Sequence, residues 1–173
     1  MYGNNYGNAQ RAQAIEKLRD LIKGINIAML TTVDPADGTL HSRPMGTQQV
    51  EFDGQLWFFT DDHSQKMHEI FQQQQVNVSY AHPGKMIYVS VSGTARQVDD
   101  RAKMEELWNP LLKAWFTEEI DTPGITLLCV DVQKAEYWES DGKLATVLQF
   151  AKALISGERR DDEMGDNQKL QLK

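Results

Sequence analysis

The chain has 173 residues, of which 40% are hydrophobic, with one cysteine and a formal net charge of −7. This length suits a single domain with a sizeable core, and the composition excludes disordered, collagen-like and disulfide-stapled chains. The acidic balance, 18 basic against 25 acidic residues, argues against proteins that coat nucleic acid or an anionic membrane. No apolar run approaches the roughly 20 residues of a membrane-spanning helix. Residues 1–6 lack the basic start and apolar core of a signal peptide, so we expect a cytoplasmic protein.

Hydrophobic periodicity predicts a helix first and then a series of strands. Apolar residues recur at helical spacing from Ile15 to Ile22, and Gly24 follows as a stop signal. Short, turn-rich loops join the first three strands, which makes these strands antiparallel neighbours. Six segments have the alternation typical of strands: Ile27–Val33, Leu40–Val50, Leu56–Thr60, Val76–Tyr80, 86–98 and Ile125–Trp138.

Helices are predicted between and after these strands. A short helix begins near Asp62, which has the side chain of an N-cap residue. A longer helical pattern over Met104–Phe116 is interrupted by Pro110, so we expect two pieces with Asn109 capping the second. A last helix is expected around Leu144–Ile155.

The strand over 86–98 contains Gly93, which predicts a bulge or a tight bend. Six mostly antiparallel strands with a few helices indicate a mainly β fold, a small closed or half-closed β-barrel.

The two ends of the chain differ in composition from the segment between them: residues 1–8 are mostly Gly, Asn and Tyr, and residues 157–173 carry nine charges. We therefore expect one domain over residues 9–156 between a flexible N-terminal arm and a flexible charged C-terminal tail.

Standard catalytic and metal-binding motifs are absent from the sequence. It contains no Gly-rich phosphate loop, no Gly-x-Gly-x-x-Gly turn and no His-Glu-x-x-His pair. Cys129 lies in an apolar strand, which is typical of a small core residue. His63 and His68, five residues apart, fall about 140° apart around a helix and do not share a face. We therefore predict no metal site.

A group of polar residues suits an anion. Arg43 is a long cation within a predicted strand, and Ser64 and Lys66 fall in the first turn of the short helix. Free N–H groups at a helix start, combined with a hydroxyl, an ammonium and a guanidinium, favour a phosphate. Spacing alone leaves open whether Arg43 meets the other two. The alternative is a helix cap with surface charges.

Four short motifs follow one another in the first half of the chain: Thr31-Thr32, then His41-Ser42-Arg43-Pro44-Met45, then Leu56-Trp57-Phe58-Phe59-Thr60-Asp61, then Ser64-x-Lys66. Their order resembles the pyridoxamine 5′-phosphate oxidase-like FMN-binding split barrels. Four later segments resemble the general stress protein 26 branch of that superfamily: Val91–Ala95, Leu107–Pro110, Lys113–Phe116 and Ala135–Trp138. The resemblance spans about residues 10–155.

This resemblance implies a six-stranded antiparallel split β-barrel that forms a homodimer, with FMN in a cleft between the subunits. Tryptophans of the second subunit would approach the flavin in such a dimer, but for Trp108 and Trp138 packing in the core is the alternative. The resemblance assigns ten residues to the flavin: Arg43, Ser64 and Lys66 at the phosphate, Pro44, Met45, Phe59, Thr60 and Asp61 at the isoalloxazine ring, and Trp108 or Trp115 from the second subunit.

The resemblance further implies a flavin-dependent oxidoreductase linked to the stress response, with NAD(P)H or another small molecule as redox substrate. True pyridoxamine phosphate oxidases carry an Arg-x-His-type signature after a C-terminal tryptophan, whereas Trp138 is followed by Glu139 and by no arginine before Arg159. We therefore do not expect vitamin B6 oxidation. One alternative is a non-catalytic protein that binds FMN or another planar cofactor, such as FAD, haem or a deazaflavin. A barrel without a cofactor is the third possibility.

Overall fold

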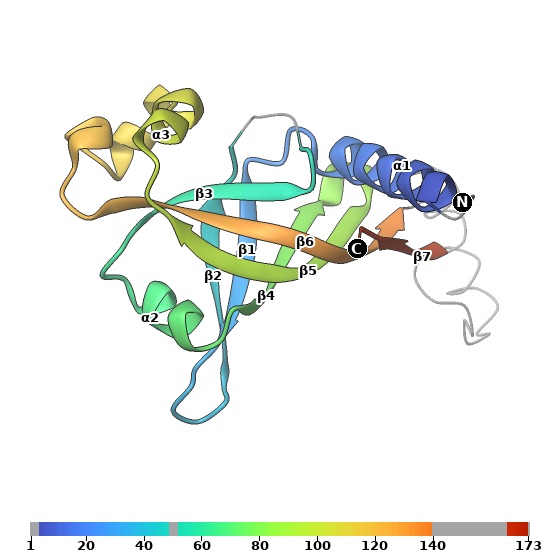
Figure 1. The fold of residues 1–173 in the computed structure, drawn as a ribbon, viewed down its shortest axis with the longest axis horizontal. Helices are drawn as coiled ribbons and strands as arrows, with labels where there is room; N and C mark the ends of the chain where they lie inside the picture. The colour runs from blue at the N-terminus through green and yellow to red at the C-terminus, as the bar shows by residue number, and fades with distance from the viewer. Residues whose placement is uncertain (1–3, 49–51, 140–165, 173) are drawn as a thin grey trace, which may run out of the picture.

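An antiparallel sheet dominates the computed structural model, which describes residues 4–48, 52–139 and 166–172 (Figure 1). Within these residues the strand order is β2-β1-β4-β5-β6-β3, and β7 pairs with β6. The curled sheet is a half-barrel of mostly antiparallel strands, as the sequence predicted. The strands are β1 (Ile27–Val33), β2 (Leu40–Gly46), β3 (Gln55–Asp61), β4 (Gln75–His82), β5 (Ile87–Val98), β6 (Ile125–Glu139) and β7 (Asp166–Gln171).

A β-bulge interrupts the pairing of the two longest strands. The register between β5 and β6 shifts at Ser92 and Gly93, where the sequence predicted a bulge. Gly93 is buried, and a Cβ atom there would lie 2.5 Å from the carbonyl oxygen of Asp131. Only glycine allows the two backbones to approach this closely.

Gly93→Ala is expected to lower the free energy of unfolding by about 1–3 kcal/mol, because the backbone of β6 must move away from the added methyl group. Gly46→Ala is the matched control, since a Cβ atom at Gly46 meets nothing within 4 Å. Urea unfolding of both variants measures the difference. A Gly93→Ala protein as stable as the Gly46→Ala protein would contradict this account of the bulge.

The helices lie around the edges of the sheet (Figure 1). α1 lies beside β7, α3 lies at the opposite end, and α2 lies near the β1–β2 hairpin. Of the described helices, none combines the length and the hydropathy that a membrane span requires. The helical segments are α1 (Asn4–Ile22), α2 (Gln65–Gln72), α3 (Arg101–Leu107) and the short 3₁₀ turns η1 (Pro83–Lys85), η2 (Pro110–Ala114) and η3 (Glu119–Asp121).

The predicted break in the second helical pattern is confirmed. α3 ends at Leu107, and η2 begins at Pro110. Asn109 caps η2, because its side-chain oxygen accepts the backbone N–H of Leu111 at 3.0 Å. The chain therefore turns at the proline, as the lost N–H and the fixed φ of proline require.

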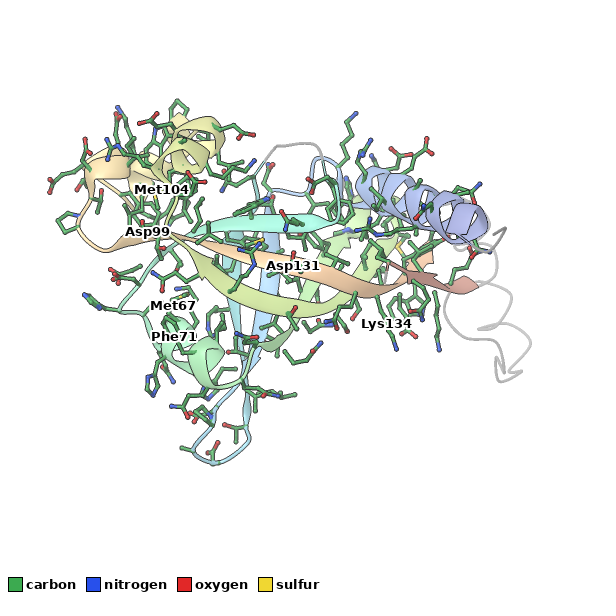
Figure 2. The ribbon with its side chains drawn as sticks, in the orientation of Figure 1. Met67, Phe71, Asp99, Met104, Asp131 and Lys134 are labelled. Carbon is green, nitrogen blue, oxygen red and sulfur yellow. The ribbon has the colours of Figure 1, made fainter. Side chains whose placement is uncertain are left out.

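Two hydrophobic clusters fill the described part of the molecule. The larger cluster joins α1, α2 and the inner face of the sheet, and it includes Leu18, Phe58 and Met67. The smaller cluster lies under α3 and η2 and includes Met104. Figure 2 shows Met104 well separated from Met67 of the larger cluster. Cys129 is fully buried in β6, and burial raises the pKa of its thiol to about 11. The cysteine is therefore an inert core residue, as expected.

The structure differs from the sequence predictions at both ends. Helix α1 begins at Asn4, inside the expected flexible arm of residues 1–8. Strand β7 and the buried Leu172 lie inside the expected charged tail of residues 157–173. Strand β7 pairs with β6, Leu172 is buried, and its carbonyl oxygen lies 2.8 Å from Arg11 Nε. The many charges of the segment predicted a solvated tail instead.

Helix α2 starts later than predicted. It begins at Gln65 with Ser64 at the N-cap position, so the N-cap predicted at Asp62 is wrong by two residues. The cause is local: the Ser64 N–H donates to the Asp61 carbonyl, which extends the turn before the helix starts. The helix expected around Leu144–Ile155 lies outside the described residues.

Candidate anion-binding site

The fold brings two of the predicted cationic side chains together. Arg43 lies on β2, while Lys66 lies in the first turn of α2, which packs against β1 and β5. Burial lowers the pKa of Lys66, and the positive charge of Arg43 lowers it further, against the opposing effect of Asp61. Arg43 is thus within electrostatic reach of Lys66, which the spacing of the sequence had left open.

The start of α2 adds hydrogen-bond donors. The hydroxyl of Ser64 donates to the Asp61 carbonyl at 2.6 Å and does not cap the helix. In the described part of the chain, the backbone N–H groups of Gln65 and Lys66 have no acceptor. Free N–H groups and the positive end of the helix dipole both favour an anion at this position.

Arg43 is fixed by a buried network and is not a loose surface charge. Its guanidinium donates to Thr32 Oγ1 at 2.6 Å and to Glu69 Oε2 at 2.9 Å. These contacts use two of the five N–H donors of an arginine, and 22% of the side chain stays exposed. The network therefore orients the guanidinium and leaves three donors for a ligand.

Glu69 is the centre of this network, and its side chain is only 1% exposed. It accepts hydrogen bonds from Thr32 and Arg43, and its Oε1 lies 2.9 Å from His41 Nδ1. Burial alone would raise the pKa of Glu69, but the hydrogen bonds from Thr32, His41 and Arg43 outweigh it and lower the pKa to about 2. The carboxylate therefore stays charged at any physiological pH.

Glu69 and its partners Thr32 and His41 are not among the site residues that the sequence predicts. Glu69 lies about 160° around α2 from Met67 and about 100° from Ile70, so helical periodicity places it outside the apolar face, yet it is buried. One feature of the sequence could have pointed to such a residue: an arginine inside the barrel, Arg43, needs a counter-ion. Periodicity cannot say which element supplies that counter-ion.

The residues predicted to line a flavin ring do not share one surface. Pro44 is exposed and Met45 is buried, because neighbours on β2 point to opposite faces. Phe59 and Thr60 are buried at the end of β3. Asp61 is exposed, and its Oδ1 accepts the backbone N–H of His63 at 2.7 Å. Of this group, Asp61 lies nearest the start of α2 along the chain.

The two candidate tryptophans have different environments. Trp108 packs edge-on against Phe59, with 5.6 Å between the ring centroids. This contact is typical of a residue that packs against the core. Trp115 follows η2 and is 68% exposed. Only the Trp115 ring is therefore largely open to a ligand or a second chain.

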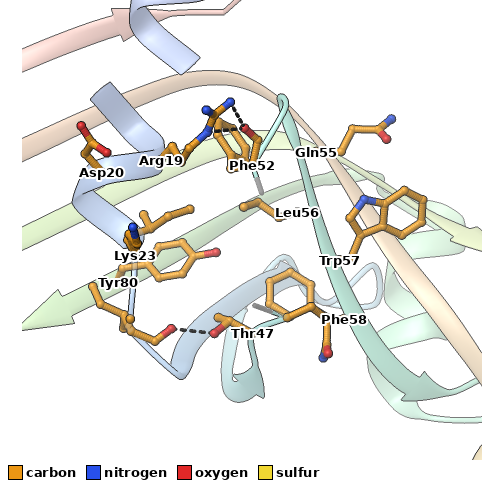
Figure 3. Close-up of a pocket in the computed structure, with 14 residues that line it drawn as sticks. Arg19, Asp20, Lys23, Thr47, Phe52, Gln55, Leu56, Trp57, Phe58 and Tyr80 are labelled. Carbon is orange, nitrogen blue, oxygen red and sulfur yellow. Dashed lines mark hydrogen bonds between the residues drawn. The ribbon is translucent and has the colours of Figure 1, made fainter. Parts of the chain in front are cut away.

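A separate cavity of about 350 Å³ lies between the end of α1 and the beginning of β3 (Figure 3). Arg19 donates to the Phe52 carbonyl at its edge, and Thr47 donates to the Ile25 carbonyl. None of the ten predicted site residues lines this cavity. The candidate anion site is at the other end of β3, where Asp61 precedes α2.

The family model described as "Pyridoxamine 5′-phosphate oxidase like" matches residues 13–161. The chain therefore belongs to this family, as its motifs indicated. It is similar to the protein bli-3 of Neurospora crassa, with 32% identity over 150 residues, 79% of this chain and 72% of that protein.

Solved structures give the same result. The general stress FMN/FAD binding protein from Xanthomonas citri is 28% identical, with a TM-score of 0.65 over 76% of this chain and 92% of that chain. General Stress Protein 26 from Bacillus anthracis str. Sterne is 26% identical, with a TM-score of 0.62 over 71% of this chain and 92% of that chain. These similarities confirm the split-barrel fold and the general stress protein 26 branch that the motifs indicated.

Proposed function

We propose that this protein is an FMN-binding flavoprotein that anchors the flavin phosphate between Arg43 and the start of α2, and that it acts as a flavin-dependent oxidoreductase. One observation carries the proposal: Arg43 contacts Glu69 of α2 at 2.9 Å, one turn from the half-buried Lys66 at the start of the same helix. The X. citri protein, which its name describes as binding FMN or FAD, supports the choice of a flavin.

The residues present fit a phosphate dianion. Lys66 has no ion-pair partner among the described residues, and the charge of Asp61 offsets its desolvation only in part, so a bound phosphate would remove a remaining cost. Arg43 offers its three remaining N–H groups, and the N–H groups of Gln65 and Lys66 add uncharged donors. FMN ends in such a phosphate, which is why we propose it over a cofactor without one.

When bound, FMN supplies hydride or electron transfer at its isoalloxazine ring. The residues of this chain bind and orient it: Arg43 and Lys66 fix the phosphate, and Glu69 and Thr32 keep Arg43 in place. We further propose NAD(P)H or another small molecule as the redox substrate. Vitamin B6 oxidation is not proposed, because an acidic residue, Glu139, follows Trp138 and forms an ion pair with Lys17 at 2.7 Å.

A homodimer is part of the proposal. The outer face of the sheet exposes Met29 on β1 beside Pro44 on β2, and Tyr88 on β5. Ser79 and Ala81 of β4 lie between Met29 and Tyr88, so these side chains form one continuous face. A second copy of the chain would cover this apolar face. The exposed Trp115 would then approach the flavin of the other subunit.

The proposal predicts that protein purified with ample riboflavin is yellow, releases FMN on denaturation and is bleached by NADH or NADPH. Lys66→Met is expected to weaken FMN binding about 10- to 100-fold, since a charge-assisted hydrogen bond contributes about 1.5–3 kcal/mol. Fluorescence titration of the apoprotein measures the affinity. The control is Lys134→Met, because Lys134 is exposed and lies far from α2 (Figure 2).

Three outcomes separate the parts of this proposal. A protein that neither retains nor rebinds flavin contradicts it entirely. Equal affinities in the Lys66→Met and Lys134→Met proteins contradict the phosphate assignment. Bound FMN that no nicotinamide donor reduces supports a non-catalytic flavin carrier instead of an oxidoreductase.

Met29→Glu is expected to convert the proposed dimer to a monomer, because it places a charge at the centre of the apolar face. Light scattering after size-exclusion chromatography measures the mass in solution. The control is Leu111→Glu, since Leu111 is exposed on η2 and not on this face. A wild-type protein that is monomeric at micromolar concentration, or a Met29→Glu protein that stays dimeric, would refute this interface.

A further inference from the structure

We propose that Asp34, His41 and Glu69 form a binding site for one divalent transition-metal cation, with Zn²⁺ as the best-suited ion. The three side chains come from three elements: the β1–β2 connection, β2 and α2. One potential ligand atom from each lies within 4.8 Å of those from the other two. The proposal does not depend on flavin binding. No sequence motif indicated it, because the residues are dispersed along the chain.

The distances suit a cation with a small adjustment of side chains. His41 Nδ1 lies 2.9 Å from Glu69 Oε1 and 4.0 Å from Asp34 Oδ2. Ligand atoms around a tetrahedral zinc ion are roughly 3.4 Å apart, given metal–ligand bonds of about 2.0–2.2 Å. The two observed distances lie on either side of this value. Shifts of about 0.5 Å would bring these two pairs to that spacing, whereas the carboxylates of Asp34 and Glu69, which lie within 4.8 Å, would close by at most about 1.4 Å.

Asp34 is oriented by its own hairpin. Its Oδ1 accepts the backbone N–H of Ala36 at 2.8 Å, and its backbone pairs with Thr39 and Gly38 across the turn. These bonds fix the carboxylate, and the other oxygen, Oδ2, faces His41. Among the described residues, none donates a hydrogen bond to Oδ2, so it is available to a cation.

The second nitrogen of His41 also has a suitable partner. Thr39 Oγ1 lies 3.5 Å from His41 Nε2, and the same hydroxyl donates its proton to Asp37 Oδ1 at 2.7 Å. With its proton given to Asp37, the Thr39 hydroxyl can accept a proton from Nε2 in the tautomer that carries one there. In its hydrogen bond with Glu69 Oε1, Nδ1 is the donor, so metal binding needs the other tautomer, with the proton on Nε2 and the Nδ1 lone pair directed at an ion between the two carboxylates. A positive ion between them would stabilise this arrangement, and metal-binding histidines are oriented through their other nitrogen in the same way.

Space and charge also suit a cation. A cavity of about 230 Å³ adjoins the cluster, with Asp34 and Glu69 in its wall, which leaves room for coordinated water. Arg43 and Thr32 contact only Oε2 of Glu69, so Oε1 remains for the ion. Two carboxylates against one arginine leave a net negative site. An imidazole among the ligands favours Zn²⁺ over Mg²⁺ or Ca²⁺, which prefer oxygen ligands alone.

Isothermal titration of the untagged, chelator-treated full chain with ZnCl₂ tests the proposal. We expect one Zn²⁺ per chain, undisturbed by excess Mg²⁺. Asp34→Asn keeps the acceptor for Ala36 but removes a charged ligand, and His41→Gln removes the imidazole. Both are expected to weaken Zn²⁺ binding more than 100-fold. Thr39→Val, which removes the partner of Nε2, is expected to weaken it about 10- to 100-fold.

His63→Gln is the matched control. His63 also lies beside a carboxylate, 3.4 Å from Asp62 Oδ1, but its side chain is 91% exposed and it meets no second acid within 4 Å among the described residues. Its removal should leave Zn²⁺ affinity unchanged. Circular dichroism confirms that each variant is folded before titration.

Two results would overturn the metal site. In the first, the wild-type chain binds no Zn²⁺. In the second, Asp34→Asn and His41→Gln bind Zn²⁺ as tightly as His63→Gln does. Since all titrations use the apoprotein, neither result bears on the flavin proposal.

Discussion

Arg43→Met is expected to lower the free energy of unfolding at pH 7 by about 3–5 kcal/mol, because it removes the cation that pairs with a buried carboxylate. The side chain of Glu69 is 1% exposed, and Arg43 Nη2 lies 2.9 Å from its Oε2. After the substitution, Thr32 and His41 still contact Glu69, but no permanent positive charge does. The loss is large against the 5–15 kcal/mol that stabilises a typical domain. Urea unfolding of the flavin-free protein measures it without a contribution from ligand.

A double variant separates this explanation from a simple packing defect. Replacing Glu69 with methionine as well removes the unpaired charge, so Arg43→Met/Glu69→Met should recover much of the lost stability. Lys66→Met is the control for charge removal near the site, because Lys66 pairs with no carboxylate in the described residues and should cost far less. If the double variant is no more stable than Arg43→Met alone, the unpaired carboxylate is not the cause.

The same pair shows why the sequence revealed one part of the site and not another. Ser64 and Lys66 are neighbours in one helical turn, so the helix start alone indicated an anion site. Arg43 lies more than twenty residues earlier, and only the curl of the sheet brings β2 near α2. Glu69 does not share the apolar face of Met67 and Ile70 on α2, so periodicity assigns it to solvent, and its burial gives no signal until its partner is known.

The fold was more predictable than the site for a physical reason. Strand alternation, turn residues and the breaks at Gly93 and Pro110 are local signals, and each is found where the sequence placed it. The errors occurred where local signals compete. Asp62 and Ser64 are both good N-cap residues, and the tight turn at Asp61 decides between them. Strand β7 is held by pairing with β6, which its charged composition conceals.

Between about pH 4.5 and pH 2, the protein is expected to lose about 3 kcal/mol of stability through Glu69 alone. The network lowers the pKa of Glu69 from its ordinary value of 4.5 to about 2 in the folded state. As the pH falls below 4.5, the unfolded chain takes up a proton at this position before the folded chain does, so unfolding becomes more favourable. Each pH unit in this range costs up to about 1.4 kcal/mol, and the loss ends once the folded state is protonated as well.

Glu69→Gln tests the assignment, because glutamine cannot titrate. Urea unfolding at half-unit steps from pH 5 to pH 2 should give a slope against pH that is flatter than that of the wild type by up to about 1.4 kcal/mol per pH unit. Glu106→Gln is the control, since Glu106 is exposed and, among the described residues, pairs with Lys103 alone, and it should keep the wild-type slope. Parallel curves for Glu69→Gln and the wild type would show that Glu69 is not the group whose protonation destabilises the fold. A flatter curve for Glu69→Gln alone would show that the carboxylate which orients Arg43 also sets the acid limit of the fold.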